Sequence, residues 1–274
     1  MQFVDVKNDI AFRKIFGNEN KSVILVSFLN AILKLKGKNR IASISISNPF
    51  QLPILPNLKA SIIDVRAKDF KNNTFIVEMQ VANPLGIDKR LLYYVSKEYS
   101  QQILSGEKYT ELNPVIFIGI FDFLFTKGDD YLSHHAICNV ETQERVVKDM
   151  DFYFIELPKF LKSGNELETV TDKWIYFIKE AESLTFIPEN LDDEGLKEAY
   201  IDANRGTWSK NELDAYIYAG MREQDYRGRV EFAIENEKIN LILKLFSKSK
   251  SIEEIAFLLD LNAEDVREII EKQD

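Results

Sequence analysis

Three polar residues interrupt two apolar segments in the first half of the chain. Asp64 stands in SIIDV, and Glu78 and Gln80 stand in FIVEMQV. Burying an unpaired carboxylate is costly, and two carboxylates opposite each other on paired strands repel. A divalent cation removes both penalties, because Mg²⁺ prefers hard oxygen ligands and is commonly held by one or two carboxylates with waters and substrate phosphates. The pattern therefore indicates a magnesium site, with Mn²⁺ as an alternative ion.

Phosphodiester hydrolysis is the chemistry that such a site would perform. A bound metal polarises the scissile phosphate, helps to generate a hydroxide nucleophile and stabilises the charge of the transition state. We expect Asp64 and Glu78 to be ligands, with the backbone carbonyl of Met79 as a further ligand. Gln80 can orient a water or a phosphate oxygen, but its amide is neither a charged donor nor a general base at neutral pH.

An ordinary polar face is the alternative interpretation of the same residues. Arg66 and Lys68 follow Asp64 with the same two-residue parity, so they are expected on its face. There they could neutralise Asp64 or contact phosphates of a nucleic acid. The basic segment KLKGKNR, at residues 34–40, is either a solvated loop or a further phosphate contact through Lys34, Lys36 and Lys38.

A β-hairpin must position these groups. The strand-like runs SIIDVRAKDF and TFIVEMQVA are separated by residues 71–73, Lys-Asn-Asn, which tolerate the left-handed conformation of a tight turn. In a hairpin centred there, paired positions sum to about 142 or 143, so Asp64 lies opposite Glu78 or Met79. Glu78 and Gln80 share a face because side chains alternate along a strand. The three polar groups are therefore expected to converge.

The elements around the hairpin follow from hydrophobic spacing. Helical spacing in the first 33 residues predicts two helices that break near residues 17–20, with Asn8 or Asp9 as the first N-cap. Residues 88–105 predict a long helix that stops at Gly106. Alternation or continuous apolar character predicts strands in IASISIS, NPVIFIGIFDFLF and MDFYFIEL, with HHAICNVE as a further candidate.

Together these elements predict an α/β fold with a restriction-endonuclease-like mixed sheet, flanked by helices and followed by a helical C-terminal region. We place the nuclease-like domain at residues 1–165 and the helical region at residues 166–274. The region ends in a helix-turn-helix-like pair at residues 251–272, where Ser251 and Glu254 have the spacing of a capping box. Its last helix, EDVREIIEK, is acidic, and its negative charge would be repelled by DNA phosphates in a groove. This favours a protein contact such as homo-oligomerisation.

Net charge and cysteine content bound the possible partners and compartment. The chain carries a net charge of −9, which by itself disfavours a polyanionic partner. Residues 1–130, however, contain 17 Lys+Arg and 13 Asp+Glu, a net +4, and residues 131–274 contain 18 and 31, a net −13. The first half therefore remains suited to DNA. A single cysteine fits a reducing cytoplasm, and we expect no signal peptide and no membrane span, which needs about 20 apolar residues.

Several motifs carry a family resemblance in the same order along the chain. They are NDIAFRKIFG, IIDVRAKD, FIVEMQ, KRLLYYVSKEYSQQILSGEKYTELNPVIFIGIFDFLF and FYFIELPKF, from about residue 5 to residue 161. The sequence resembles the family of recombination-promoting nucleases and transposases within the PD-(D/E)XK superfamily. This resemblance implies a sheet flanked by helices, Mg²⁺-dependent cleavage of DNA, and a role in horizontal gene transfer, recombination or defence. It also implies that Asp64 and Glu78 are the acidic metal ligands.

Gln80 departs from the superfamily pattern implied by the resemblance, because it stands where lysine is usual; the E-x-Q form looks like this family's own variant. A lysine would supply positive charge to the transition state. Lys89 or Arg90 could replace it, because the family has a basic residue there, although a solvated first helical turn explains both equally well. Of the neighbouring Tyr93 and Tyr94, one is expected in the core and the other could stack on a base or bond a phosphate.

Asp9 also matches an acidic position of the family. It could assist the metal through a water, and the N-capping role is an equal alternative.

Two other functions stay open at this point. A cleavage-deficient nuclease fold that binds DNA or a protein partner would explain the missing lysine and the acidic second half. A carboxylate-pair glycosidase is the weaker alternative, because the chain has only two tryptophans to line a sugar-binding cleft.

Overall fold

The predicted hairpin forms around a left-handed residue. Strands β4 (Val65–Asp69) and β5 (Thr74–Gln80) pair antiparallel, and Asn72 in the turn has a φ of 62°. The Asp69 carboxylate accepts hydrogen bonds from the backbone N–H groups of Lys71 and Asn73, each at 2.9 Å. Val65 pairs with Val77, so paired positions sum to 142, one of the two predicted registers. Asp64, directly before β4, is therefore level with Glu78.

The hairpin belongs to a six-stranded mixed sheet. The computed structural model describes residues 1–47, 50–51, 61–189 and 191–272. In this part of the chain the sheet has the order β1-β4-β5-β6-β8-β7, and only the pairs β5–β6 and β6–β8 are parallel. The other strands are β1 (Ile44–Ser47), β6 (Val115–Phe121), β7 (Leu132–Ala136) and β8 (Met150–Glu156). A separate two-stranded pair consists of β2 (Phe50–Gln51) and β3 (Ser61–Ile62). All the predicted strands of the sheet are confirmed.

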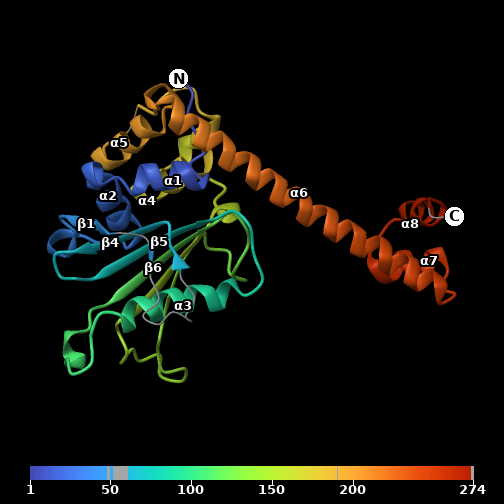
Figure 1. Cartoon of the computed structure of the whole chain (residues 1–274), viewed down its shortest axis with the longest axis horizontal. Coiled ribbons are helices and arrows are strands. Elements are labelled where there is room, and N and C mark those ends of the chain that lie inside the picture. The colour runs from blue at the N-terminus through green and yellow to red at the C-terminus, as the bar shows by residue number, and fades with distance from the viewer. Residues whose placement is uncertain (48–49, 52–60, 190, 273–274) are drawn as a thin grey trace. The chain divides into compact units, whose positions relative to one another are not determined.

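Helices cover both faces of the sheet, as Figure 1 shows. On one side lie α1 (Asp9–Phe16), α2 (Ser22–Ile32), α4 (Val170–Glu180) and α5 (Glu194–Ala203), and on the other lies α3 (Ile87–Ser100). Alternation along β5 sends Phe75, Val77 and Met79 to the α1 side, whereas Ile76 packs on the α3 side. The predicted α/β class, with a mixed sheet flanked by helices and a helical C-terminal region, is confirmed.

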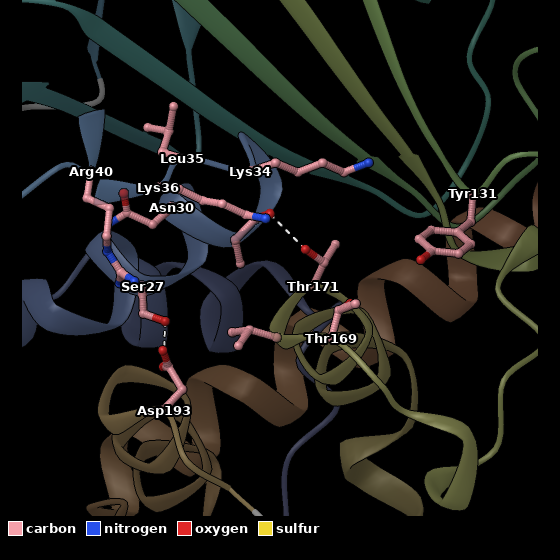
Figure 2. A pocket seen from close by; sticks show the side chains of 12 residues that line it. Ser27, Asn30, Lys34, Leu35, Lys36, Arg40, Tyr131, Thr169, Thr171 and Asp193 are labelled. Carbon is pink, nitrogen blue, oxygen red and sulfur yellow. Dashed lines mark hydrogen bonds between the residues drawn. The ribbon is translucent and has the colours of Figure 1, made fainter. Parts of the chain in front are cut away.

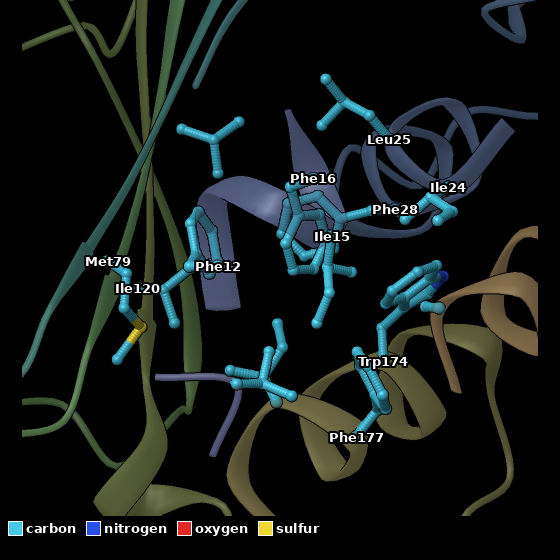
Figure 3. Packing of buried hydrophobic residues seen from close by; sticks show 14 of the residues in the cluster. Phe12, Ile15, Phe16, Ile24, Leu25, Phe28, Met79, Ile120, Trp174 and Phe177 are labelled. Atoms are coloured by element: carbon cyan, nitrogen blue, oxygen red, sulfur yellow. The ribbon is translucent and has the colours of Figure 1, made fainter. Parts of the chain in front are cut away.

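Aromatic packing fixes α1 against the sheet. Phe12 points from α1 toward Met79 and Ile120 of the sheet, as Figure 3 shows. Phe16 contacts Phe28 of α2 with ring centroids 5.1 Å apart and also contacts Trp174 of α4 at 5.7 Å. These rings are fully buried or nearly so. The backbone of α1 is therefore held rigidly, and so are the starting points of its polar side chains.

The first helix begins at the predicted boundary. The Asn8 side chain caps it, because its Oδ1 accepts from the backbone N–H groups of Ile10 at 3.0 Å and Ala11 at 3.4 Å. The short 3₁₀ turn η1 (Glu19–Lys21) separates α1 from α2, as expected. Asp9 is thus not the cap.

The prediction that α3 continues to Gly106 is wrong. The helix ends at Ser100, and Gly106, with φ of 95°, lies in a later turn. Gln102 explains the early end, because its side chain bonds the backbone of Asn113 twice, donating to the carbonyl at 2.9 Å and accepting from the N–H at 2.8 Å. These bonds draw the chain toward β6.

The chain divides into two compact units, Met1–Tyr216 and Ile217–Asp274. Helices α4 and α5 belong to the first unit and bury Trp174, Leu196 and Tyr200 in its core. The division that we place at residue 165 stays a prediction. Short 3₁₀ turns in the first unit are η2 (Gly37–Asn39), η3 (Tyr109–Glu111), η4 (Leu157–Lys159), η5 (Gly164–Glu166), η6 (Ala181–Ser183) and η7 (Arg205–Thr207).

The second unit is helical. The long helix α6 (Lys210–Ser247) starts before its boundary, and α7 (Ile252–Leu259) and α8 (Ala263–Glu271) follow. The predicted capping box is confirmed, because Ser251 N–H donates to Glu254 Oε2 at 3.0 Å and Glu254 N–H donates to Ser251 Oγ at 3.2 Å. A small core of Ile242, Ile255 and Val266 joins the three helices. Among the described residues, no helix is both long enough and apolar enough to cross a membrane.

Candidate functional site

The backbone changes direction at Asp64. Val65 and Ala67 pack on the α1 side of the sheet, and a regular strand would place Ile63 there too. Ile63 instead packs on the α3 side, fully buried. The alternation of side chains therefore breaks at Asp64. The Asp64 carboxylate lies beside the end of β5, where its Oδ2 accepts a hydrogen bond from the Met79 backbone N–H at 2.9 Å.

Two buried carboxylates meet at this position, as the hairpin register predicts. The Asp64 backbone N–H donates to Glu78 Oε1 at 3.1 Å. The Glu78 residue is 4% exposed and the Asp64 side chain 9%. Burial raises the pKa of Asp64, and burial followed by the charge of Asp64 raises the pKa of Glu78 well above its usual value. Both shifts disfavour the charged forms, so a cation between the two groups would stabilise the site.

The Met79 carbonyl is directed to the same edge. The N–H and C=O groups of one strand residue point to the same side of the strand. Gln80 C=O accepts from Asp122 on the β6 side at 2.9 Å, and the Met79 N–H points the opposite way, to Asp64. The Met79 carbonyl therefore faces the edge where β4 has ended, the orientation that a third oxygen ligand needs.

These oxygen donors fit a hard divalent cation. No group of three or more His, Cys, Asp or Glu side chains that could hold a metal occurs among the described residues. The candidate set is thus two carboxylates and one carbonyl, which suits Mg²⁺ completed by waters and substrate phosphate. It does not suit a structural zinc site, which takes four nitrogen or sulfur ligands.

Arg13 is a site residue that the sequence did not predict. Its Nε and Nη2 donate to Asp64 Oδ1 at 3.1 and 2.9 Å, and its side chain is 41% exposed. The partners are 51 positions apart, and α1 brings them together. The one available signal was that Arg13 stands four residues after Asp9, on the same helical face.

The alternative of Arg66 as the neutralising partner of Asp64 is wrong. Arg66 points to the α3 side, where its Nε donates to Glu98 Oε2 at 2.9 Å. Glu98 is 2% exposed, so the two residues form a largely buried ion pair between β4 and α3. The break in alternation at Asp64 is the reason that the parity argument failed. Lys68 also lies on β4, and its role as a phosphate contact stays a prediction.

Gln80 is held in one orientation by two neighbours. Its Nε2 donates to Glu78 Oε2 at 3.1 Å, and its Oε1 accepts from Arg90 Nη2. The Nε of Arg90 is buried without a hydrogen-bond partner among the described residues. Arg90 therefore reaches the site, whereas the adjacent Lys89 is exposed.

The tyrosine pair and Asp9 lie near the same groups. Tyr94 is half-buried, and burial followed by the charge of Glu78 raises its pKa. Tyr93 is 38% exposed, and the Lys97 ammonium lies 5.7 Å from its ring centroid. Asp9 is exposed on α1, and its charge contributes to the raised pKa of Asp64. A role of Asp9 in assisting the metal stays a prediction.

A hollow elsewhere in the first unit is lined in part by the predicted basic segment. Its volume is about 580 Å³, and Lys34, Lys36 and Arg40 line it together with the start of α4, as Figure 2 shows. Asp193 also lines it, and its carboxylate accepts from Ser27 Oγ and from the Leu196 N–H. The hollow therefore carries three basic residues and one acidic residue.

The comparisons with known proteins give one match. A family model described as "PD-(D/E)XK nuclease family transposase" matches residues 6–233. The matched range includes α1, the hairpin and α3, and therefore every residue of the carboxylate site. No curated protein and no solved structure matches the chain.

Proposed function

The chain belongs to the PD-(D/E)XK nuclease family transposases, and from this premise we propose that it is a Mg²⁺-dependent DNA endonuclease that hydrolyses phosphodiester bonds. One observation carries the proposal: the hydrogen-bonded, buried pair of Asp64 and Glu78 at the end of β5. Family membership supports a nuclease and implies DNA as substrate, and PD-(D/E)XK nucleases generally use divalent metals. Transposition, recombination and defence are the roles that we consider.

Asp64, Glu78 and the Met79 carbonyl would hold the metal. When bound, Mg²⁺ supplies polarisation of the scissile phosphate and acidifies a water. The hydrogen bonds at the site fix the geometry, because the Met79 N–H sets the angle of Asp64 and the Asp64 N–H sets that of Glu78. Met79 would thus serve twice, as a backbone donor to one ligand and as a ligand itself.

Gln80 would orient a water or a phosphate oxygen and take no part in the reaction itself. Because its amide is held between Glu78 and Arg90, its donor side faces a carboxylate and its acceptor side faces a guanidinium. Arg90 then brings positive charge next to Gln80, the position that lacks a lysine. Lys89, Tyr93 and Tyr94 would flank the DNA on the same helix.

Basic side chains of the first unit would contact the DNA backbone. Lys34 and Lys36 line the hollow beside the start of α4, and Lys38 lies in the same loop. Lys68 is a further candidate, whereas the ion pair of Arg66 with Glu98 reduces its value as a phosphate contact. Each lost phosphate contact should reduce the slope of log K against log[salt] by roughly 0.9.

Plasmid cleavage tests the proposal. Purified protein is incubated with supercoiled plasmid in Mg²⁺, Mn²⁺ or Ca²⁺, beside Asp64→Ala, Glu78→Ala and the control Glu141→Gln in an exposed segment. We expect wild type and the control to nick or linearise the plasmid, and both alanine variants to lose cleavage while keeping their far-UV circular dichroism. Undiminished cleavage by either pure alanine variant would show that the carboxylate pair is not the active site.

A cleavage-deficient module that binds DNA or a partner is the second candidate. The contact of Arg13 with Asp64 favours it, because a guanidinium can neutralise this carboxylate without any metal. Calorimetric titration with Mg²⁺ separates the candidates. A nuclease binds the ion in a manner that Asp64→Ala abolishes, whereas a module of this kind shows no Asp64-dependent binding.

We also propose that the helical C-terminal region forms a homo-oligomer. Several large apolar side chains of α6 in the second unit are exposed, including Ile217, Met221, Phe232 and Ile234. An exposed apolar series on a helix is a frequent basis for protein contacts. Light scattering after size exclusion would report the mass in solution, and a monomer at micromolar concentration would contradict this proposal.

A further inference from the structure

Arg13 is the charged residue at the site to which the proposed chemistry gives no role. It projects from a helix whose opposite side is locked in the core by Phe12, Ile15 and Phe16. The backbone of α1 is therefore anchored on its core side. The Arg13 side chain can move, because it is 41% exposed and long.

Both donors of Arg13 are directed at one oxygen. Nε and Nη2 lie 3.1 and 2.9 Å from Asp64 Oδ1, whereas the other oxygen, Oδ2, accepts the Met79 N–H. A divalent cation that uses Asp64 must share an oxygen with one of these donors. The Met79 N–H belongs to a buried strand and stays in place, so Oδ1 is the oxygen that can be vacated.

A guanidinium and Mg²⁺ cannot both sit at Oδ1 at low energy. Their charges repel, and the site is partly buried, so the repulsion is less screened than it would be in water. Arg13 and the metal are therefore competitors for the same ligand atom.

We propose that Arg13 is a displaceable counter-ion of Asp64: it holds the carboxylate before the metal binds, and metal binding releases its guanidinium to contact the DNA phosphate. This inference rests on the proposed nuclease function and deepens it. Arginine suits both states, because its planar donors match a carboxylate and a phosphate equally well. Its charge would stand where the superfamily's lysine is missing.

Arg90 cannot act as a displaceable counter-ion of this kind. Its Nη2 is engaged by Gln80, and its Nε is buried. Arg90 therefore stays on the Gln80 amide, and Arg13 is the cation of the pair that can move. The two arginines approach the carboxylates from opposite sides of the sheet, α1 and α3.

Calorimetric titration of DNA-free protein with Mg²⁺ tests the competition. The variants are Arg13→Met, Arg13→Lys and the control Arg145→Met. Arg145 forms a comparable pair with Asp151, at 2.6 Å, but Asp151 is level with Phe75 rather than with Glu78 in the sheet. The full-length chain is used throughout.

The expected signs differ for metal binding and for cleavage. Arg13→Met should bind Mg²⁺ about two- to fivefold more tightly than wild type, as expected from removing one partly exposed charge contact. With saturating Mg²⁺, its plasmid cleavage should be slower by roughly a hundredfold, the usual effect of losing one donor to transition-state charge. Arg13→Lys should lie between, and Arg145→Met should match wild type in both measurements.

Equal or weaker Mg²⁺ binding by Arg13→Met would overturn the inference, because a merely structural ion pair lowers metal affinity when it is removed. Undiminished cleavage would overturn it as well. A wild type that binds Mg²⁺ through Asp64 but cleaves no DNA would instead remove the proposed nuclease function, and the comparison of affinities would still decide whether Arg13 competes with the metal.

Discussion

Without metal, the Glu78→Gln variant should be at least as stable as the wild type. With Mg²⁺, the wild type should be the more stable protein. The substitution keeps the size of the side chain and removes its charge. In the wild type, burial and the neighbouring Asp64 hold the pKa of Glu78 well above its ordinary value of 4.5. A carboxyl whose pKa is raised by folding lowers stability at every pH above its unfolded value, because the unfolded chain ionises more readily.

Hydrogen bonding offsets part of this gain. The amide introduced at position 78 can still accept from the Asp64 N–H through its oxygen. Its nitrogen, however, would face Gln80 Nε2, which in the wild type donates to Glu78 Oε2. The hydrogen bond between residue 78 and Gln80 is therefore lost, which costs about 1 kcal/mol. Because the pKa shift is large, we expect the metal-free variant at pH 7 to unfold at a temperature no lower than the wild type.

Mg²⁺ should act on the wild type alone. A ligand that binds only the folded state, at a hundred times its dissociation constant, adds about 2.7 kcal/mol to the free energy of unfolding. For a unit of about 200 residues this corresponds to a rise of roughly 5–10 °C in Tm. Without the charge of Glu78 the variant should gain almost nothing, so the wild type becomes the more stable protein.

Thermal unfolding followed by circular dichroism at pH 7, with EDTA or with Mg²⁺, measures both effects. Glu141→Gln, an exposed carboxylate in the same unit, is the matched control and should follow the wild type in both buffers. A Glu78→Gln variant that melts well below the wild type in EDTA would contradict a destabilising charge at position 78. A variant that keeps the full Mg²⁺-dependent rise in Tm would contradict a role of Glu78 in binding the metal.

Two further predictions concern the support of the site. Gly195→Ala should lower stability by about 1–3 kcal/mol in urea unfolding, because an added Cβ would lie 2.5 Å from the Val23 carbonyl oxygen of α2. Acid unfolding should report Asp172, whose pKa lies at about 2 despite burial, because Tyr131, Lys162 and Thr169 donate hydrogen bonds to it. Its contribution, roughly 2 kcal/mol, is complete above pH 3.8 and lost as pH falls through 2, so Asp172→Asn should flatten the pH dependence of stability in this interval.

The hairpin could be predicted from the sequence because its determinants are local. The pair Asn72 and Asn73 suits a left-handed turn, and the turn sets the register by counting. Counting from the turn placed Asp64 level with Glu78 or Met79, and the observed register selects Glu78. The same holds for the Asn8 cap and the Ser251 capping box, whose partners are two to three residues away.

Contacts between distant elements were beyond the sequence pattern. The pairing of Arg13 with Asp64 depends on how α1 packs across the sheet, and no spacing rule relates position 13 to position 64. Two-residue parity placed Arg66 on the same face as Asp64, and the break in alternation at Asp64 separates the two side chains. The predicted end of α3 at Gly106 was wrong for a similar reason. The hydrogen bonds between Gln102 and Asn113 end the helix earlier than helical spacing suggests.

The break in alternation at Asp64 also divides the sequence by its tolerance of insertions. Within β4 and β5 the side chains alternate between the two faces, so one residue added inside either strand would shift the register that brings Asp64 level with Glu78. A residue added before Ile63 leaves this register unchanged, because positions in the hairpin pair by their distance from its own turn. Proteins that share this geometry can therefore vary in length upstream of the bend and keep the same pair of carboxylates in place.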